Sequence, residues 1–128
     1  MILLLDTHLL LWAAYEPARL SPGAREEIER ESNELVFSAA SIWEVSIEAS
    51  LGRADFDADS RVLRRGLLEN GYAELAVTGA HGAAVSDLPP LHRDPFDRIL
   101  VAQARAEGST LLTGDTLVAA YGSPVRLV

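Results

Sequence analysis

The sequence predicts one α/β domain with a mainly parallel central sheet of four or five strands. Short apolar runs of strand length recur along the chain, helical segments with recognisable start and stop residues separate them, and this alternation continues over the full length. The 128 residues suffice for one core of ordinary size and not for two. We therefore expect residues 1–128 to form a single domain.

Five segments have the length and composition of strands. Residues 2–5 form an uninterrupted apolar run, typical of a strand that is buried on both faces of a parallel sheet. Residues 35–37 and 110–113 are similar in kind. We expect a weak strand at 73–77 and an edge strand at 125–128.

Helix signals occupy the intervals between these strands. We expect longer helices at 6–15, 25–33, 41–51, 60–70 and 94–107, and short ones after Thr78 and after Asp115. Ser21 is a cap followed by a proline in the first turn, ahead of the charged segment 25–33. Ser41 and Glu44 fit a capping box, Asp94 precedes a proline that starts a helix, and Gly108 is a stop signal. A polar linker that runs through Asp59 separates two of the helices.

Composition excludes several classes of function. The absence of Cys removes disulfides, thiolate zinc sites and cysteine nucleophiles. All 11 basic residues are Arg, so mechanisms that need Lys, such as P-loop nucleotide binding and Schiff bases, are excluded. The net charge of −8 disfavours nonspecific nucleic-acid binding and favours bound cations or a cationic partner, although a local Arg patch stays possible.

The apolar N-terminal run does not have the form of a signal peptide. Asp6 cuts it off, no basic segment precedes it, and no small-residue cleavage site follows. No apolar run approaches the roughly 20 residues that cross a bilayer. We therefore expect a cytoplasmic protein with no membrane partner.

Four acidic residues are expected at one edge of the sheet. Asp6 and Asp115 follow strands, whereas Glu44 and Asp97 lie in the first turns of helices. In a parallel sheet these positions meet at the edge where ligands bind. Each acid taken alone also fits a helix cap or a first-turn position.

The electrostatic repulsion among carboxylates gathered in this way has to be compensated. At about 4 Å each like-charged pair costs roughly 4 kcal/mol in a protein-like dielectric. The cluster would therefore require a bound divalent cation, a neighbouring Arg or raised pKa values. Oxygen ligands favour Mg²⁺ or Mn²⁺, and such a site suits hydrolysis of a phosphodiester.

The sequence predicts structural roles for the histidines and tryptophans. His8, His81 and His92 lack the spacing of a zinc site, so we expect His8 on a helix face near the acids and the other two in loops or on the surface. Trp12 and Trp43 lie among apolar helix residues and are expected in the core, not as base-stacking platforms.

Four sequence blocks carry a family resemblance. They are residues 3–8 (LLLDTH), 38–44 (SAASIWE), 88–98 (LPPLHRDPFDR) and 111–115 (LLTGD). In this order they resemble the successive motifs of PIN-domain ribonucleases of the VapC toxin type, over nearly the whole chain. The HRDPFDR block is the most specific of them.

This resemblance implies a three-layer α/β/α fold and a Mg²⁺- or Mn²⁺-dependent endoribonuclease. Such proteins are usually homodimers that a small VapB-type antitoxin inhibits, often by directing an Arg at the acidic site. The resemblance implies catalytic and metal-ligand roles for Asp6, Glu44, Asp97 and Asp115. Thr113 would orient Asp6 or Asp115, whereas Asp94 fits better as a helix cap.

One position departs from the family pattern. Relatives commonly have Lys one turn after the matching Glu, and here the residue is Glu48. Glu44 and Glu48 at this spacing repel by roughly 0.2–0.5 kcal/mol instead of forming a supportive pair. The departure makes the site more negative and puts catalytic efficiency in question.

RNA phosphates would have to be met by arginines. We expect contacts from Arg93 and Arg98 beside the site and from Arg53. Arg61, Arg64 and Arg65 form a further group that fits a solvated helix face equally well.

The sequence leaves two alternatives to compare with a nuclease. One is a catalytically weak PIN-like protein-binding module, whose acids accept an Arg from a partner without turnover. The other is an aspartyl-phosphate phosphatase of the haloacid dehalogenase type, which needs a second Asp where this chain has His8 and a Lys that it lacks.

Overall fold

A computed structural model describes residues 1–52 and 58–128 of the chain. The elements follow in the order β1 (Ile2–Leu5), α1 (Thr7–Tyr15), the 3-10 helix η1 (Pro17–Arg19), α2 (Pro22–Glu29), β2 (Glu34–Ser38), α3 (Ala39–Ser50), α4 (Ser60–Glu69), β3 (Ala73–Leu75), α5 (Gly79–Ala84), the 3-10 helix η3 (Val85–Asp87), α6 (Pro95–Glu107), β4 (Thr110–Thr113), α7 (Thr116–Ala119) and β5 (Val125–Leu127).

The strands form a five-stranded sheet in the order β3-β2-β1-β4-β5, and every neighbouring pair is parallel. β1 lies at the centre, with Leu3 paired to Leu35 of β2 and Leu4 paired to Leu111 of β4. The predicted parallel sheet is confirmed. Because all the strands point the same way, the residues that follow them lie along one edge.

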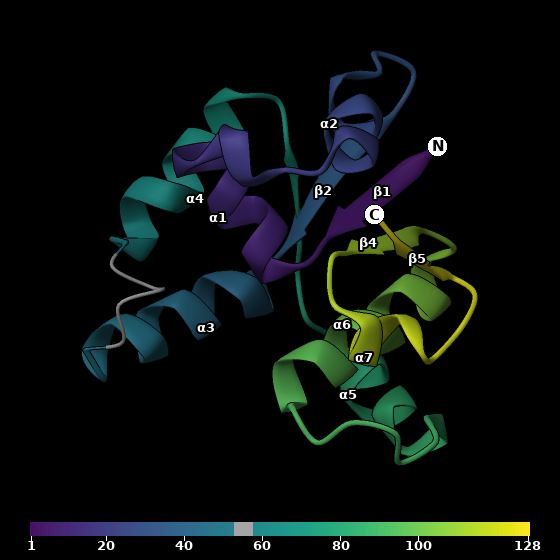
Figure 1. The fold of residues 1–128 in the computed structure, drawn as a ribbon. Coiled ribbons are helices and arrows are strands. Elements are labelled where there is room, and N and C mark those ends of the chain that lie inside the picture. The colour runs from purple at the N-terminus through teal and green to yellow at the C-terminus, as the bar shows by residue number, and fades with distance from the viewer. Residues whose placement is uncertain (53–57) are drawn as a thin grey trace.

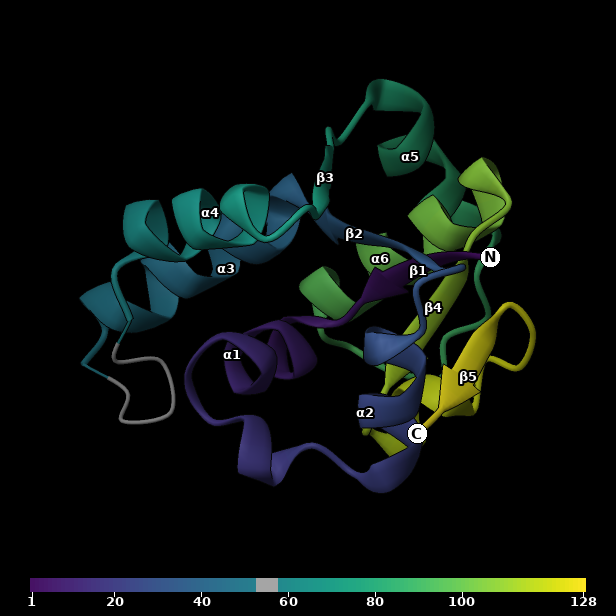
Figure 2. The ribbon, with the colours of Figure 1, turned by 90° about the horizontal axis from the view of Figure 1, so that it is seen from above.

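Helices cover both faces of this sheet (Figures 1 and 2). Leu3 and Leu5 pack in a core cluster with side chains of α1, α2, α3 and α4, whereas Leu4 belongs to a second cluster with side chains of α6 and α7. This alternation follows from the two-residue repeat of a strand. The three-layer α/β/α architecture is therefore confirmed, and it explains why the run from Leu3 to Leu5 is fully buried.

Helix α3 begins earlier than its sequence predicts. Ser38 is its N-cap, with the side-chain oxygen accepting a hydrogen bond from the Ala40 amide at 3.0 Å, because the chain turns directly from β2 into the helix. Ser41 lies inside the helix and is buried. The predicted capping box of Ser41 and Glu44 is therefore wrong, and Glu44 is available to the sheet edge.

Helix α2 starts at Pro22, directly after the predicted cap Ser21, but it ends at Glu29 instead of residue 33. Ser21 caps it by accepting from the Ala24 amide at 3.0 Å. The weak strand predicted at 73–77 ends at Leu75. Over the described residues, no helix combines the length and apolar character that a membrane crossing requires.

Helix α6 has the predicted bounds at both ends. Asp94 caps its start, and Gly108 closes it in the left-handed conformation at φ 66°. A side chain at this φ is strained even where space is open, and a Cβ on Gly108 would meet no atom within 4 Å. Gly66, inside α4, likewise has open space around it but carries no such backbone constraint.

The same substitution at these two glycines should have opposite effects. We expect Gly108→Ala to lower the free energy of unfolding by about 1 kcal/mol, because alanine is strained at positive φ. Gly66→Ala should raise it by roughly 0.4–1 kcal/mol, because it restricts the unfolded chain and favours the helix. Urea unfolding of both variants measures the difference, and an equal shift in both would contradict the left-handed cap.

Candidate active site

Asp6 stands immediately after β1 and is fixed at both of its carboxylate oxygens. Its Oδ1 accepts a hydrogen bond from the Leu9 amide at 2.9 Å, so it is the N-cap of α1. Its Oδ2 accepts one from Thr113 Oγ1 at 2.5 Å. The side chain is thus both a cap and a rigidly oriented acid, and only 5% of the residue is exposed.

Thr113 links the two acids that follow β1 and β4. Its Oγ1 donates to Asp6 and accepts from the backbone amide of Asp115 at 3.0 Å. Asp115 in turn caps α7 by accepting from the Leu117 amide at 2.8 Å. A hollow of about 400 Å³ lies beside these acids, and Arg19 and Trp12 are among the residues that line it.

Glu44 is buried on α3 and is held from α1. Thr7 Oγ1 donates a hydrogen bond to Glu44 Oε1 at 2.6 Å and is also hydrogen bonded to Ser41 Oγ at 2.9 Å. Sequence reasoning missed Thr7 and Ser41. The position of Thr7 directly after Asp6 is the signal that could have identified it, since the turn after a strand end faces the ligand edge.

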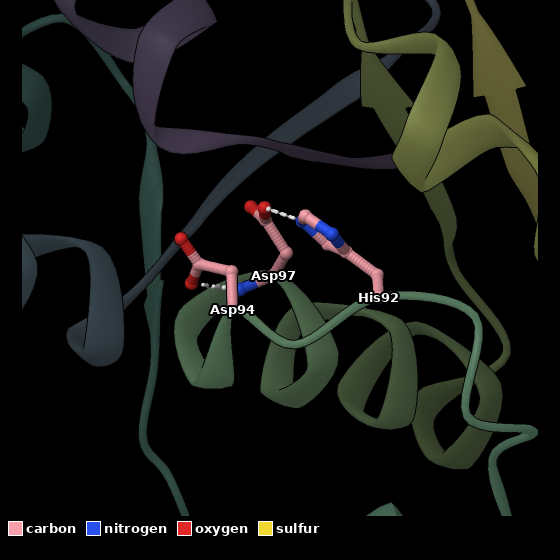
Figure 3. Close-up of side chains that lie close together, drawn as sticks. All are labelled: His92, Asp94 and Asp97. Carbon is pink, nitrogen blue, oxygen red and sulfur yellow. Dashed lines mark hydrogen bonds and ion pairs between the residues drawn. The ribbon is translucent and has the colours of Figure 1, made fainter.

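Asp94, Asp97 and His92 form a compact group at the start of α6 (Figure 3). Each offers a ligand atom, and these atoms lie within 4.8 Å of one another. Asp94 Oδ1 accepts from the amides of Phe96 and Asp97 at 2.8 and 3.2 Å, which confirms its predicted cap role. His92 Nε2 lies 2.7 Å from Asp97 Oδ2. The sequence did not assign His92 to the site.

His81 was expected in a loop or on the surface, and that prediction is wrong. It lies in α5 and is 2% exposed. Its Nδ1 accepts from the Thr78 amide at 3.0 Å in a capping box, and its Nε2 is 3.0 Å from Glu107 Oε2. A histidine at the third helical position can take the usual place of Glu there, because its ring nitrogen reaches back to the cap amide. His8 is exposed and lines the hollow beside Asp6, near the acids as predicted.

Burial raises the pKa of three of these carboxyl groups. The pKa of Glu44 rises from 4.5 to about 7 and that of Asp97 from 3.8 to about 6. Burial also raises the pKa of Asp6. In each case desolvation disfavours the charged form and raises the pKa. Hydrogen bonds from Thr7, His92 or Thr113 partly offset this rise in pKa.

The acids also raise one another's pKa values. The charges of Asp94 and Asp97 add to the rise at Glu44. Those of Asp94 and Asp6 add to the rise at Asp97, and that of Asp115 adds to the rise at Asp6. Five acidic side chains therefore share one electrostatic neighbourhood at the carboxyl edge of the sheet.

Glu48, one turn after Glu44, extends this negative region along α3. Its charge also raises the pKa of Glu44, in agreement with the like-charge repulsion that the sequence predicts.

Arg98 is engaged by the protein itself. Its guanidinium donates to main-chain carbonyls of Val85, Leu88, Pro89 and His92 and to the Tyr121 hydroxyl. The sequence placed this side chain on an RNA phosphate. The role that the contacts assign to Arg98 is to fasten the segment before α6 to the helix, which the sequence could not reveal because most of its partners are backbone carbonyls.

Four further arginines bear on the predicted RNA contacts. Arg93 is exposed next to Asp94, as a phosphate contact requires. Arg64 forms a two-point ion pair with Glu74, at 2.7 and 3.0 Å, which favours a structural role within its exposed group. Arg53 lies outside the described residues. Arg19 borders the hollow at Asp6 and was not anticipated.

Trp43 was expected in the core, and that prediction is wrong. It is 63% exposed, and its ring meets Phe96 in an edge-on contact with centroids 5.3 Å apart. The buried face of α3 is formed by other positions, among them Glu44 and Val45, so Trp43 points away from the sheet. Trp12, by contrast, packs partly buried against the core as predicted.

Comparison with known proteins decides the family. The family model of the PIN domain matches residues 3–122. This chain belongs to the PIN-domain family. The PIN domain is 30% identical over 122 residues to Ribonuclease VapC22 of Mycobacterium tuberculosis, and the match covers 94% of this chain and 92% of that protein. The resemblance to VapC proteins is thereby confirmed.

Solved structures show the same fold. This PIN domain is similar to a chain of VapBC2 from Rickettsia felis bound to a DNA fragment from their promoter, with a TM-score of 0.71 and 15% identity over 100% of this chain and 98% of that one. It is also similar to VapC20 of Mycobacterium tuberculosis, described as a Sarcin-Ricin loop cleaving toxin, with a TM-score of 0.63 and 18% identity over 94% and 95% of the two chains.

The donor set of this PIN domain fits a hard divalent cation. Carboxylate oxygens are the ligands that Mg²⁺ and Mn²⁺ prefer, and here they share one edge and repel one another. A cation would lower the raised pKa values by favouring the charged forms. Nε2 of His92 is engaged by Asp97 Oδ2, so this nitrogen is not free to bind a metal while that bond is present.

The raised pKa values predict how stability depends on pH. The folded chain holds more protons than the unfolded chain between about pH 4.5 and 7, because the pKa of Glu44 is about 7 instead of 4.5. The free energy of unfolding of the metal-free protein should therefore fall as the pH rises through this window. At about 1.4 kcal/mol per pKa unit, Glu44 alone contributes roughly 3 kcal/mol.

Urea unfolding in EDTA at pH 5 and pH 8 measures this dependence. Glu44→Gln, which cannot ionise, should lose much of the difference between the two pH values, and Mg²⁺ should reduce it in the wild type. A wild-type protein that is equally stable at both pH values would contradict the electrostatic account of the site.

Proposed function

We propose that this PIN domain is a Mg²⁺- or Mn²⁺-dependent endoribonuclease of the VapC type. The observation that carries the proposal is the convergence of acidic side chains from four segments on one sheet edge, where they raise one another's pKa values. The identity with Ribonuclease VapC22 supports it, because that likeness extends over nearly all of both chains.

Four of the acids share one role in this proposal, and a fifth supports them. The metal ligands are Asp6, Glu44, Asp97 and Asp115, with Asp94 in support. A divalent ion held there supplies a Lewis acid for the phosphodiester and lowers the pKa of a water molecule.

The surrounding side chains fix these acids in place. Thr113 orients Asp6, and Thr7 orients Glu44, through hydrogen bonds that favour the charged carboxylate. Both are buried, so the donors have little freedom to turn elsewhere. The protein thus organises the acids before any ligand binds.

RNA binding would be local, since the whole chain is acidic. Arg93 is exposed beside Asp94, and Arg19 lines the hollow beside Asp6. Both guanidinium groups lie close to acids of the site and are suited to contact phosphates. Binding through them would weaken as the salt concentration rises.

Incubation of the purified protein with total cellular RNA tests the proposal. We expect cleavage with Mg²⁺ or Mn²⁺ and none with EDTA. Asp6→Asn and Glu44→Gln should lower the cleavage rate at least about 100-fold, the scale of a single catalytic group. Glu26→Gln is the matched control, because Glu26 is an exposed acid of α2 that pairs with Arg30.

Two results would argue against a nuclease. If the wild type does not bind metal and does not cleave RNA, the chain is better described as a PIN-like protein-binding module. If Asp6→Asn cleaves as fast as the wild type, the activity does not arise from this site.

We further propose that the PIN domain acts in the cytoplasm as a homodimer and is inhibited by a VapB-type antitoxin. Its structural relatives include the VapBC2 complex of Rickettsia felis, which supports such a partner. An acidic site of this kind attracts a guanidinium, which binds carboxylates through two hydrogen bonds.

An antitoxin encoded by a short neighbouring reading frame should copurify with the PIN domain and suppress RNA cleavage. Replacing by Gln the antitoxin Arg that reaches the acids should restore cleavage while leaving the complex detectable by size-exclusion chromatography. A partner that binds but leaves cleavage unchanged would contradict inhibition.

A further inference from the structure

We propose that His92 is a positioning residue of this site, which holds the Asp97 carboxylate toward the other acids by donating a hydrogen bond from Nε2. The inference rests on the proposed function and deepens it, because it adds a residue that acts through a metal ligand. His92 is not itself expected to touch the metal or the RNA.

The local geometry carries the first step. His92 Nε2 and Asp97 Oδ2 are 2.7 Å apart, and the two side chains are only 17% and 22% exposed. A carboxylate can only accept, so the ring nitrogen is the donor when Asp97 is charged. Figure 3 shows the ring of His92 beside Asp97, with Asp94 on the other side. The imidazole thus lies on one flank of this carboxylate and a negative charge on the other.

His92 lies in the loop before α6, so the helix does not determine its place. Its carbonyl oxygen is instead bound by two side chains, Arg98 Nη1 at 3.4 Å and the Tyr121 hydroxyl at 3.5 Å. Arg98 and Tyr121 are also joined to each other at 2.9 Å. The loop is therefore docked between α6 and the segment after α7.

Arg98 strengthens this docking at several points. The same guanidinium binds Pro89 O at 3.0 Å and Val85 O at 3.2 Å, upstream of His92. Arg98 directly follows Asp97 in the sequence, so the residue beside the acid fixes the loop that carries its donor. The position of the imidazole relative to the carboxylate is consequently set by the docked backbone of the loop, and not only by the rotamer of His92.

The surroundings of Asp97 explain why it needs such a donor. Its side chain is only 22% exposed, and ligand atoms of Asp94 and Asp97 lie within 4.8 Å of each other. Without an opposing donor the carboxylate would rotate away from this like charge. The hydrogen bond from His92 holds the carboxylate in place, as hydrogen bonds to metal-binding carboxylates do in general.

Two amide substitutions separate this role from others. The side-chain nitrogen of Gln can take the place of imidazole Nε2, whereas that of Asn takes the place of Nδ1 and is too short to reach Asp97. We expect His92→Asn and His92→Leu to weaken metal binding about 10- to 100-fold, the usual effect of removing such a partner. His92→Gln should bind within a few-fold of the wild type.

Binding of Mn²⁺ to each purified variant is measured from the free-ion signal in electron paramagnetic resonance, and binding of Mg²⁺ by calorimetry. The midpoint of thermal unfolding in EDTA reports folding separately. If His92→Leu does not fold, His92→Asn is the variant that lacks the donor. The rates of RNA cleavage by the same variants should follow the order of their metal affinities. The rate that is lost in His92→Asn should be recovered in His92→Gln.

Three outcomes would overturn the inference. They are wild-type metal affinity in His92→Asn or His92→Leu, an affinity in His92→Gln as low as in His92→Asn, and a wild type that binds no metal. A wild type that binds Mn²⁺ but leaves RNA intact would overturn the proposed nuclease function, while the comparison of affinities would still decide the role of His92.

Discussion

Repulsion among partly buried carboxylates is the constraint around which this domain is organised. Parallel strands deliver Asp6 and Asp115 to the same edge, α3 adds Glu44, and the start of α6 adds Asp97. Bringing such groups together opposes folding. Asp6, Glu44 and Asp97 are therefore each held by a side-chain partner (Thr113, Thr7 and His92), and Asp115 accepts from a backbone amide. Hydrogen bonds between different elements therefore make the site rigid. The same bonds favour the ionised form of the carboxylates, on which the chemistry of the site depends.

The two faces of the sheet contribute differently to this arrangement. The cluster with α1 and α3 places Thr7 against Glu44, whereas the opposite cluster supports α6 and the loop that carries His92. Leu3, Leu4 and Leu5 belong to both sides by alternation and leave β1 no freedom to slip. A shift of one residue in β1 would move Asp6 away from Thr113.

Much of this was accessible from the sequence because it depends on short-range rules. The end of a strand located Asp6 and Asp115, and a proline after an acid located the start of α6 at Asp94. The α3 boundary was missed because Ser38 and Ser41 are equally good caps in isolation. Only the strand that precedes the helix favours Ser38.

The missed site residues depend on contacts that no local pattern encodes. His92 meets Asp97 across a loop whose path is set by backbone carbonyls bound to Arg98. An apolar helix likewise does not show which of its large side chains faces the sheet, and for this reason Trp43 was misplaced. Sequence reasoning thus identified the acids and Thr113, but not Thr7 and His92, the other two residues that orient them.

The hydrogen bond between Thr113 and Asp6 joins residues 107 positions apart. During translation, the first acid emerges from the ribosome long before the threonine that orients it. A nascent or truncated chain that ends before β4 consequently lacks both this bond and Asp115, so the acidic centre is completed only after β4 has been made. Under the proposed function, RNA cleavage would therefore begin only after this late segment has joined the N-terminal one.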